Sequence, residues 1–166
     1  MESIKLFVSS DKIKWGMPQS KINLFTSEVN SSVPYKDFSG NHEICRHEKE
    51  LGGVVLYVTP VFKQGLISLK AFFELDSDMA SYRSFIEFIK KEFGEPSYAT
   101  KEEWKGKNLM GYPCNIWILP DAILEAGIRE EAFVALGYAV LTVKDNFKEV
   151  YTQEYLKKMG WNPSGL

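Results

Sequence analysis

The stretch NHEICRHEKE, residues 41–50, brings together the side chains of this chain that are best suited to metal binding or catalysis. His42, Cys45 and His47 are all possible zinc ligands, and a cysteine close to a histidine is also the pair that thiol nucleophiles use. In a strand, side chains alternate between two faces, so Cys45 and His47 would share one face and His42 would lie on the other. Three ligands on one ion would then require a bulge or a loop here.

The rest of the sequence does not complete either use. A structural zinc site takes four ligands, and Cys114 is the one cysteine or histidine that lies elsewhere in the chain. No glycine-rich segment flanks Cys45 to supply an oxyanion hole. We therefore expect a polar strand with no catalytic residue, no metal and no cofactor. An enzyme of unrecognised type that uses Cys45 and His47 stays open as a third hypothesis.

Other signatures of catalysis or phosphate binding are absent from the sequence. It contains neither G-x-x-x-x-G-K-[ST] nor G-x-G-x-x-G. The segment Leu51-Gly52-Gly53 precedes a strand pattern, which favours a turn over a phosphate-binding loop. The acidic pairs Glu102-Glu103 and Glu130-Glu131 are adjacent in the chain, so we expect their side chains to diverge and not to converge in a cleft. The sequence therefore predicts a protein that is not an enzyme.

Composition places the chain among globular proteins of one domain, residues 1–166. It is 45% hydrophobic, and its net charge of −2 provides no broad field for nucleic acid or an anionic membrane. Two cysteines are too few for a disulfide framework. No apolar run is long enough for a signal peptide or a membrane span. We expect a cytoplasmic protein with free thiols, and the removal of a leader segment stays open.

Hydrophobic periodicity predicts a sheet in the first half of the chain. A short helix is expected over residues 18–28. Period-two patterns then predict strands at 42–48, 53–62 and 66–75, with Lys63-Gln64-Gly65 as the turn of a hairpin. The last of these strands has one wholly apolar face, which a helix must cover. The residues of that face are Ile67, Leu69, Ala71, Phe73 and Leu75.

The covering helix is predicted over residues 76–96. Apolar residues recur there at steps of three and four, and Gly94 and Pro96 mark the end. The stripe consists of Met79, Tyr82, Phe85, Ile86, Ile89 and Phe93.

The second half of the chain is less clear than the first. A strand is expected over 112–120, and 121–143 is expected to form a hairpin that turns near 129–131. A helix over 121–139 is the alternative, because its alanines and glutamates favour one. A final helix from Asp145 carries Phe147, Tyr151, Tyr155 and Met159 on its apolar side. The predicted fold is α+β, a single domain of mainly antiparallel sheet with helices packed on one face.

Two short motifs resemble small bacterial binding modules of the SmpA/OmlA type and of the β-lactamase inhibitory protein type. The first is KWGMPQSKI, in which Trp15, Gly16, Met17 and Ile22 carry the match, and the second is EFGEP at residues 92–96. Pro18 departs from the pattern, which usually has serine or threonine there. The resemblance implies a non-catalytic module that binds another protein, and it transfers no active-site residue.

These observations lead to two functional hypotheses of different classes. The first is a bacterial protein-binding module, most specifically an immunity protein that neutralises a cognate toxin by direct binding, with no role for nucleic acid or membrane. Exposed tryptophan and acidic side chains would form the contact surface. The candidates are Trp104, Glu102, Glu103, Glu48, Glu50, Glu130 and Glu131.

The alternative hypothesis is a small-molecule-binding protein. Its aromatic pocket would lie between the sheet and a helix and would be lined by Tyr57, Phe72 and Trp117. The identity of the partner or ligand and the oligomeric state stay open.

Overall fold

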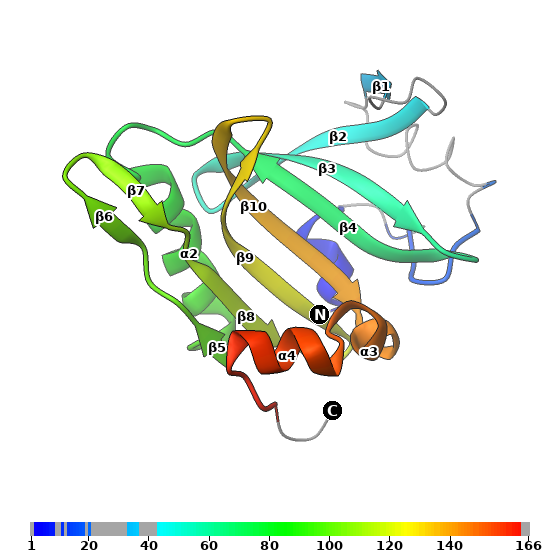
Figure 1. The fold of residues 1–166 in the computed structure, drawn as a ribbon. Coiled ribbons are helices and arrows are strands. Elements are labelled where there is room, and N and C mark those ends of the chain that lie inside the picture. Colours follow the sequence, from blue (N-terminus) through cyan, green and yellow to red (C-terminus); the bar gives the residue numbers. More distant parts are fainter. Residues whose placement is uncertain are drawn as a thin grey trace.

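A computed structural model describes residues 2–8, 11, 13–18, 20, 33–36 and 43–163, with the backbone alone at 33–36 and 43–47. The predicted α+β fold, a mainly antiparallel sheet with helices packed on it, is confirmed (Figure 1). The helices are η1 (Ser3–Leu6), α2 (Ala80–Phe93), η3 (Lys144–Asn146), α3 (Phe147–Val150) and α4 (Gln153–Met159). The strands are β1 (Val33–Lys36), β2 (Glu43–Leu51), β3 (Val54–Phe62), β4 (Leu66–Phe73), β5 (Tyr98–Ala99), β6 (Glu103–Lys105), β7 (Asn108–Gly111), β8 (Cys114–Ile118), β9 (Ala122–Glu131) and β10 (Val134–Val143).

Within the described part of the chain, eight strands form one sheet in the order β1-β2-β3-β4-β10-β9-β8-β5. Every pairing in it is antiparallel, and β6 and β7 form a separate hairpin between β5 and β8. The strands expected at 42–48, 53–62 and 66–75 correspond to β2, β3 and β4, and the turn at residues 63–65 joins the last two. The short helix expected over 18–28 lies almost wholly outside the described residues.

Helix α2 covers the apolar face of the sheet as its periodicity predicts. Tyr82, Phe85, Ile86 and Ile89 are buried, and the ring of Phe85 lies 5.0 Å from that of Phe73 on β4. Acidic side chains cap the first turn of the helix. Asp76 accepts hydrogen bonds from the backbone amide and the hydroxyl of Ser81, and Asp78 accepts one from the Ala80 amide. Gly94 ends it, with a positive φ of 80°.

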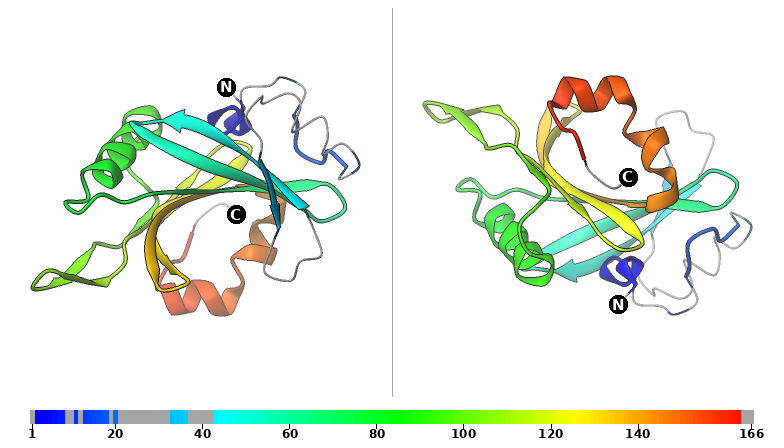
Figure 2. Two further views of the ribbon diagram at one scale, coloured as in Figure 1. Left: turned by 90° about the horizontal axis from the view of Figure 1, so that it is seen from above. Right: turned by 90° about the horizontal axis from the view of Figure 1, so that it is seen from below.

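The C-terminal helices pack against the opposite face of the sheet. Alternation along β8 and β9 directs Trp117 and Leu124 toward α2, and it directs Ile116 and Ile123 toward a second cluster. That second cluster is completed by Phe147, Tyr151 and Leu156. Figure 2 shows α2 and the C-terminal helices on opposite sides of a strongly curved sheet. Helices α2 and η1 pack on one face of the sheet, as expected. Helices α3 and α4 in addition cover the other, concave face.

The C-terminal segment is two helices and not one. Tyr151 has non-helical φ and ψ angles of −103° and 76°, and the Thr152 hydroxyl caps a new helix by accepting a hydrogen bond from the Tyr155 amide. The break rotates the second helix, so that Leu156 becomes buried and Tyr155 exposed. The expected stripe holds for Phe147 and Tyr151 but is wrong for Tyr155.

Residues 121–143 form a hairpin, and the alternative of a helix over 121–139 is wrong. The two strands pair from Val143↔Ala122 to Val134↔Glu131, so the turn falls at Ala132 and Phe133 and not at 129–131. Strand β9 is buried from Ala122 to Ile128. Its neighbours on both faces override the helix preference of its alanines and glutamates.

Gly127 sets how closely β9 can approach the chain before β8. A Cβ at this position would lie 2.1 Å from the carbonyl oxygen of Pro113, which accepts a hydrogen bond from the Ile128 amide. We predict that Gly127→Ala lowers the free energy of unfolding by about 3 kcal/mol in urea denaturation. Gly111→Ala is the control, because the three atoms nearest to its Cβ would all belong to the flexible side chain of Glu103. Equal losses in the two variants would contradict this reasoning.

Candidate protein-binding surface

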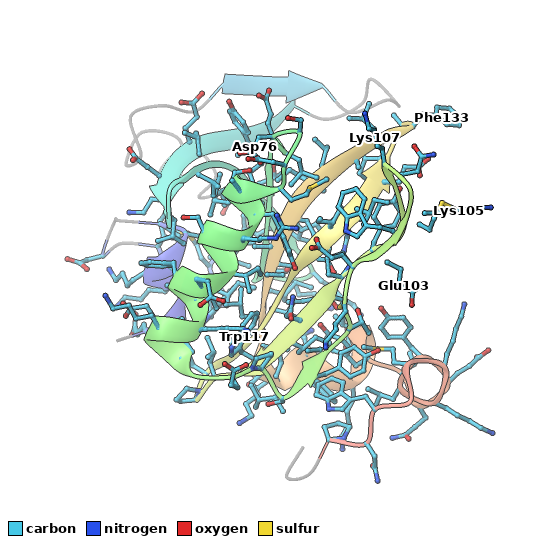
Figure 3. All side chains as sticks on the ribbon, turned by 90° about the vertical axis from the view of Figure 1, so that its left-hand side faces the viewer. Asp76, Glu103, Lys105, Lys107, Trp117 and Phe133 are labelled. Carbon is cyan, nitrogen blue, oxygen red and sulfur yellow. The ribbon has the colours of Figure 1, made fainter. Side chains whose placement is uncertain are left out.

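The β9–β10 hairpin ends in an almost fully exposed aromatic residue. The side chain of Phe133 is 97% exposed, and that of Val134 beside it is also exposed. Figure 3 shows Phe133 at the outer end of the hairpin, directed away from the body of the molecule. A phenylalanine in this position contributes nothing to the core, although burial of such a side chain typically yields about 1.5–3 kcal/mol.

The turn that presents Phe133 also has an unfavourable backbone. Ala132 and Phe133 are its two central residues, and both have positive φ angles, of 49° and 68°. This is the pattern of a type I′ turn, which strongly prefers Asn-Gly or Gly-Gly. Positive φ is an outlier for a bulky residue such as phenylalanine, and it costs on the order of 1–3 kcal/mol.

The same chain contains a hairpin in which this turn is built with the favoured residues. Between β2 and β3, Gly52 and Gly53 occupy the two central positions, with φ angles of 57° and 82°. That turn packs against α2, where a Cβ on Gly52 would lie 2.9 Å from the Cβ of Phe88. The expected role of this segment as a turn is confirmed. At 132–133 the strained choice coincides with solvent exposure, so packing does not explain it.

Two carboxylates, those of Glu130 and Glu131, lie on β9 next to the Phe133 tip. Glu130 and Glu131 are both exposed, and Glu130 accepts a hydrogen bond of 3.0 Å from the Tyr112 hydroxyl. This hydrogen bond raises the pKa of Tyr112. Arg129 turns away from the tip, because its guanidinium lies 3.9 Å from the centre of the Tyr138 ring on the concave face. The tip therefore combines an apolar centre with negative charge.

The β6–β7 hairpin carries a second exposed aromatic residue, Trp104, with 43% of its surface accessible. Its electrostatics differ from those of the first hairpin. Glu102 is paired with Arg83 on α2 at 2.6 Å, a contact that raises the pKa of the arginine. Figure 3 shows Lys105 and Lys107 on this hairpin together with Glu103. Its charge is therefore mixed.

The seven side chains expected to bind a partner do not form one patch. Glu130 and Glu131 flank the Phe133 tip, whereas Glu102, Glu103 and Trp104 belong to the β6–β7 hairpin. Glu48 and Glu50 lie on β2, opposite Tyr57 and Val55 of β3, and are separated from β9 by three strands. Phe133 was missed by sequence reasoning. The turn was expected at 129–131, which excludes Phe133, so the aromatic residue was assigned to a strand and not to the tip.

The residues of the aromatic pocket in the alternative hypothesis do not lie together. Trp117 is buried beneath α2, where its indole Nε1 donates a hydrogen bond of 2.9 Å to the Gly94 carbonyl (Figure 3). Tyr57 and Phe72 are a cross-strand pair of β3 and β4. Their strand neighbours Val58 and Phe73 belong to the core beneath α2, so this pair lies on the opposite face. The three residues therefore cannot line one cavity.

The residues that first suggested chemistry lie partly outside the described structure. Cys45 and His47 belong to β2, but their side chains are not described, and His42 is outside the described residues. In the described part of the chain, no three His, Cys, Asp or Glu residues are grouped to hold a metal. Burial raises the pKa of the Cys114 thiol to about 12, and the carboxylate of Glu125 reinforces this. The Cys114 thiol is thus protonated at neutral pH and is a poor nucleophile.

Comparison with protein-family models, curated proteins and solved structures finds no significant match. None of the described helices is long and apolar enough to cross a membrane. The function of the protein is therefore inferred from its own structure.

Replacing Ala132-Phe133 by Asn-Gly tests whether the tip is strained. We predict that the double variant raises the free energy of unfolding by about 1–2 kcal/mol in urea denaturation, because Asn-Gly fits the type I′ turn. Phe133→Ala is the control, since it removes the exposed ring and keeps the unfavourable backbone. It should change stability by less than about 0.5 kcal/mol. A double variant no more stable than this control would rule out backbone strain.

The reactivity of Cys114 gives a second test. In a Cys45→Ser variant, alkylation by iodoacetamide at about pH 8 should be more than about 100-fold slower in the folded protein than in concentrated urea. The reason is that burial raises the pKa of the Cys114 thiol to about 12 and restricts access to it. Folded and unfolded rates within about tenfold of each other would contradict this prediction, and mass spectrometry can follow both.

Proposed function

We propose that this protein is a non-catalytic binding module that inserts Phe133 into an apolar pocket of another protein. The exposure of Phe133 on a strained two-residue turn carries the proposal. Exposed aromatic side chains at protein interfaces act as anchors when they enter a pocket and lose their contact with water. Backbone strain that packing does not explain is typical of sites where presentation of a side chain matters more than stability.

The charge around the tip indicates the kind of partner. Glu130 and Glu131 border Phe133, so the complementary pocket should be apolar with a basic rim. A partner of this description fits the hypothesis of an immunity protein that binds a bacterial toxin domain in the cytoplasm. The resemblance of residues 14–22 and 92–96 to small bacterial binding modules supports the same class.

Photo-crosslinking at position 133 can identify the partner directly. We expect a benzoylphenylalanine at this position to form a discrete adduct with one protein in cells of the source organism. The control replaces Phe93, at the far end of α2, which is also a phenylalanine and is 37% exposed. It should yield no such adduct, because it lies outside the proposed surface.

The purified partner then tests the energetic role of Phe133. We predict that Phe133→Ala weakens binding at least tenfold in calorimetry, whereas Phe93→Ala changes affinity by less than about twofold. Equal affinities for the two variants, or no adduct specific to position 133, would overturn the proposal. If the partner is a toxin, its expression should stop growth of a bacterial host unless this chain is co-expressed, and Phe133→Ala should reduce that protection.

A further inference from the structure

The concave face of the sheet contains a pocket that has no part in the proposed protein-binding surface. Its volume is about 280 Å³, close to the lower end of the range for small-ligand sites. Its lining residues come from β4, β9 and β10 and from the C-terminal segment around α3 and α4, which Figure 2 shows on the concave side of the sheet. The residues around it are Lys70, Glu125, Arg129, Val140, Thr142, Val150, Tyr151 and Tyr155.

One row of paired residues forms the floor of the pocket. Val140 of β10 pairs with Lys70 of β4 on one side and with Glu125 of β9 on the other. The three side chains therefore share one face, and the Cα atoms of the lysine and the glutamate lie about 10 Å apart across the row.

Both carboxylate oxygens of Glu125 already interact with other side chains of this protein. Its Oε1 accepts a hydrogen bond of 3.1 Å from the Tyr151 hydroxyl, and its Oε2 lies 3.5 Å from Nη2 of Arg129. Its side chain is only 12% exposed. This carboxylate therefore organises the wall of the pocket, and little of it is left to bind a ligand.

The cationic groups, in contrast, have unused capacity. The Lys70 side chain is exposed and makes no hydrogen bond or ion pair with any residue that the structure describes. Arg129 uses one of its N–H groups toward Glu125 and stacks on the Tyr138 ring, which leaves further donors. With two cations and one anion, the pocket has a net charge of +1.

We propose that this pocket binds a small organic anion, a single carboxylate on a compact apolar or aromatic body. The carboxylate would lie between Lys70 and Arg129, which can form charge-assisted hydrogen bonds to it. The body of the ligand would contact Val140, Val150 and the ring of Tyr155. An amine is disfavoured because both cations would repel it and because Glu125 is already satisfied.

Benzoate, benzamide and benzylamine test the charge of the preferred ligand, because they share a ring and differ in charge. In protein with ¹³C-labelled valine methyl groups, benzoate should shift the signals of Val140 and Val150 saturably, with a low-millimolar dissociation constant. Benzamide should bind at least tenfold more weakly, and benzylamine should cause no shift at either valine. No benzoate shift, equal binding of benzamide, or tighter binding of benzylamine would each overturn the proposal.

Two lysine variants test the position of the ligand. Lys70→Met removes the unpaired charge and keeps the length of the side chain, and we expect it to weaken benzoate binding at least fivefold. The control, Lys105→Met, changes an exposed lysine on the β6–β7 hairpin and should leave binding unchanged. Equal effects of the two variants would exclude Lys70 from the site. If Lys70→Met does not fold, the binding of benzoate, benzamide and benzylamine to the unaltered protein still decides the proposal. None of these measurements requires the protein partner proposed for Phe133.

Discussion

Burial of β9 on both faces is the constraint on which the rest of the structure depends. Its residues Ala122–Ile128 are all buried, so the chain must supply a cover on each side of the sheet. Leu124 and Ala126 belong to the core beneath α2, while Ile123 belongs to the cluster beneath the C-terminal helices. Glu125 places a carboxylate in the middle of this strand. A buried charge is tolerated only when it is hydrogen-bonded, and the Tyr151 hydroxyl, at the junction of α3 and α4, meets that need.

This rigid strand also explains why the hairpin tip can be strained. Strands β9 and β10 pair over their full lengths, and β10 is held in turn by β4. These hydrogen-bonded ladders and the packing of the two hydrophobic cores fix the backbone of the hairpin up to Glu131 and Val134. The two residues of the turn must then close the hairpin in a conformation that suits neither of them. A flexible base would relax the strain and lose the fixed orientation of Phe133.

The sequence predicted those elements whose burial is one-sided and local. The stripe of α2 is an example, since Tyr82, Phe85 and Ile89 lie within one element and need no knowledge of the remaining fold. Residues 121–139 were ambiguous because β9 is buried on both faces, which removes the alternation that identifies a strand. The grouping of Tyr57, Phe72 and Trp117 failed for a different reason. Alternation within each strand was correct, but which faces coincide depends on pairing through β4, β10, β9 and β8, and a single sequence does not contain that order.

The same alternation separates the two proposed binding surfaces along one strand. Arg129 faces the concave side, where its guanidinium lies over Tyr138. Glu130, the next residue, turns to the opposite side and meets the Tyr112 hydroxyl. Neighbouring residues of β9 thus contribute to different surfaces without competing for space, as period-two geometry requires. The residues assigned to the tip, Glu130, Glu131 and Phe133, include none of those that line the pocket, so separate variants of the same molecule can measure the two kinds of binding.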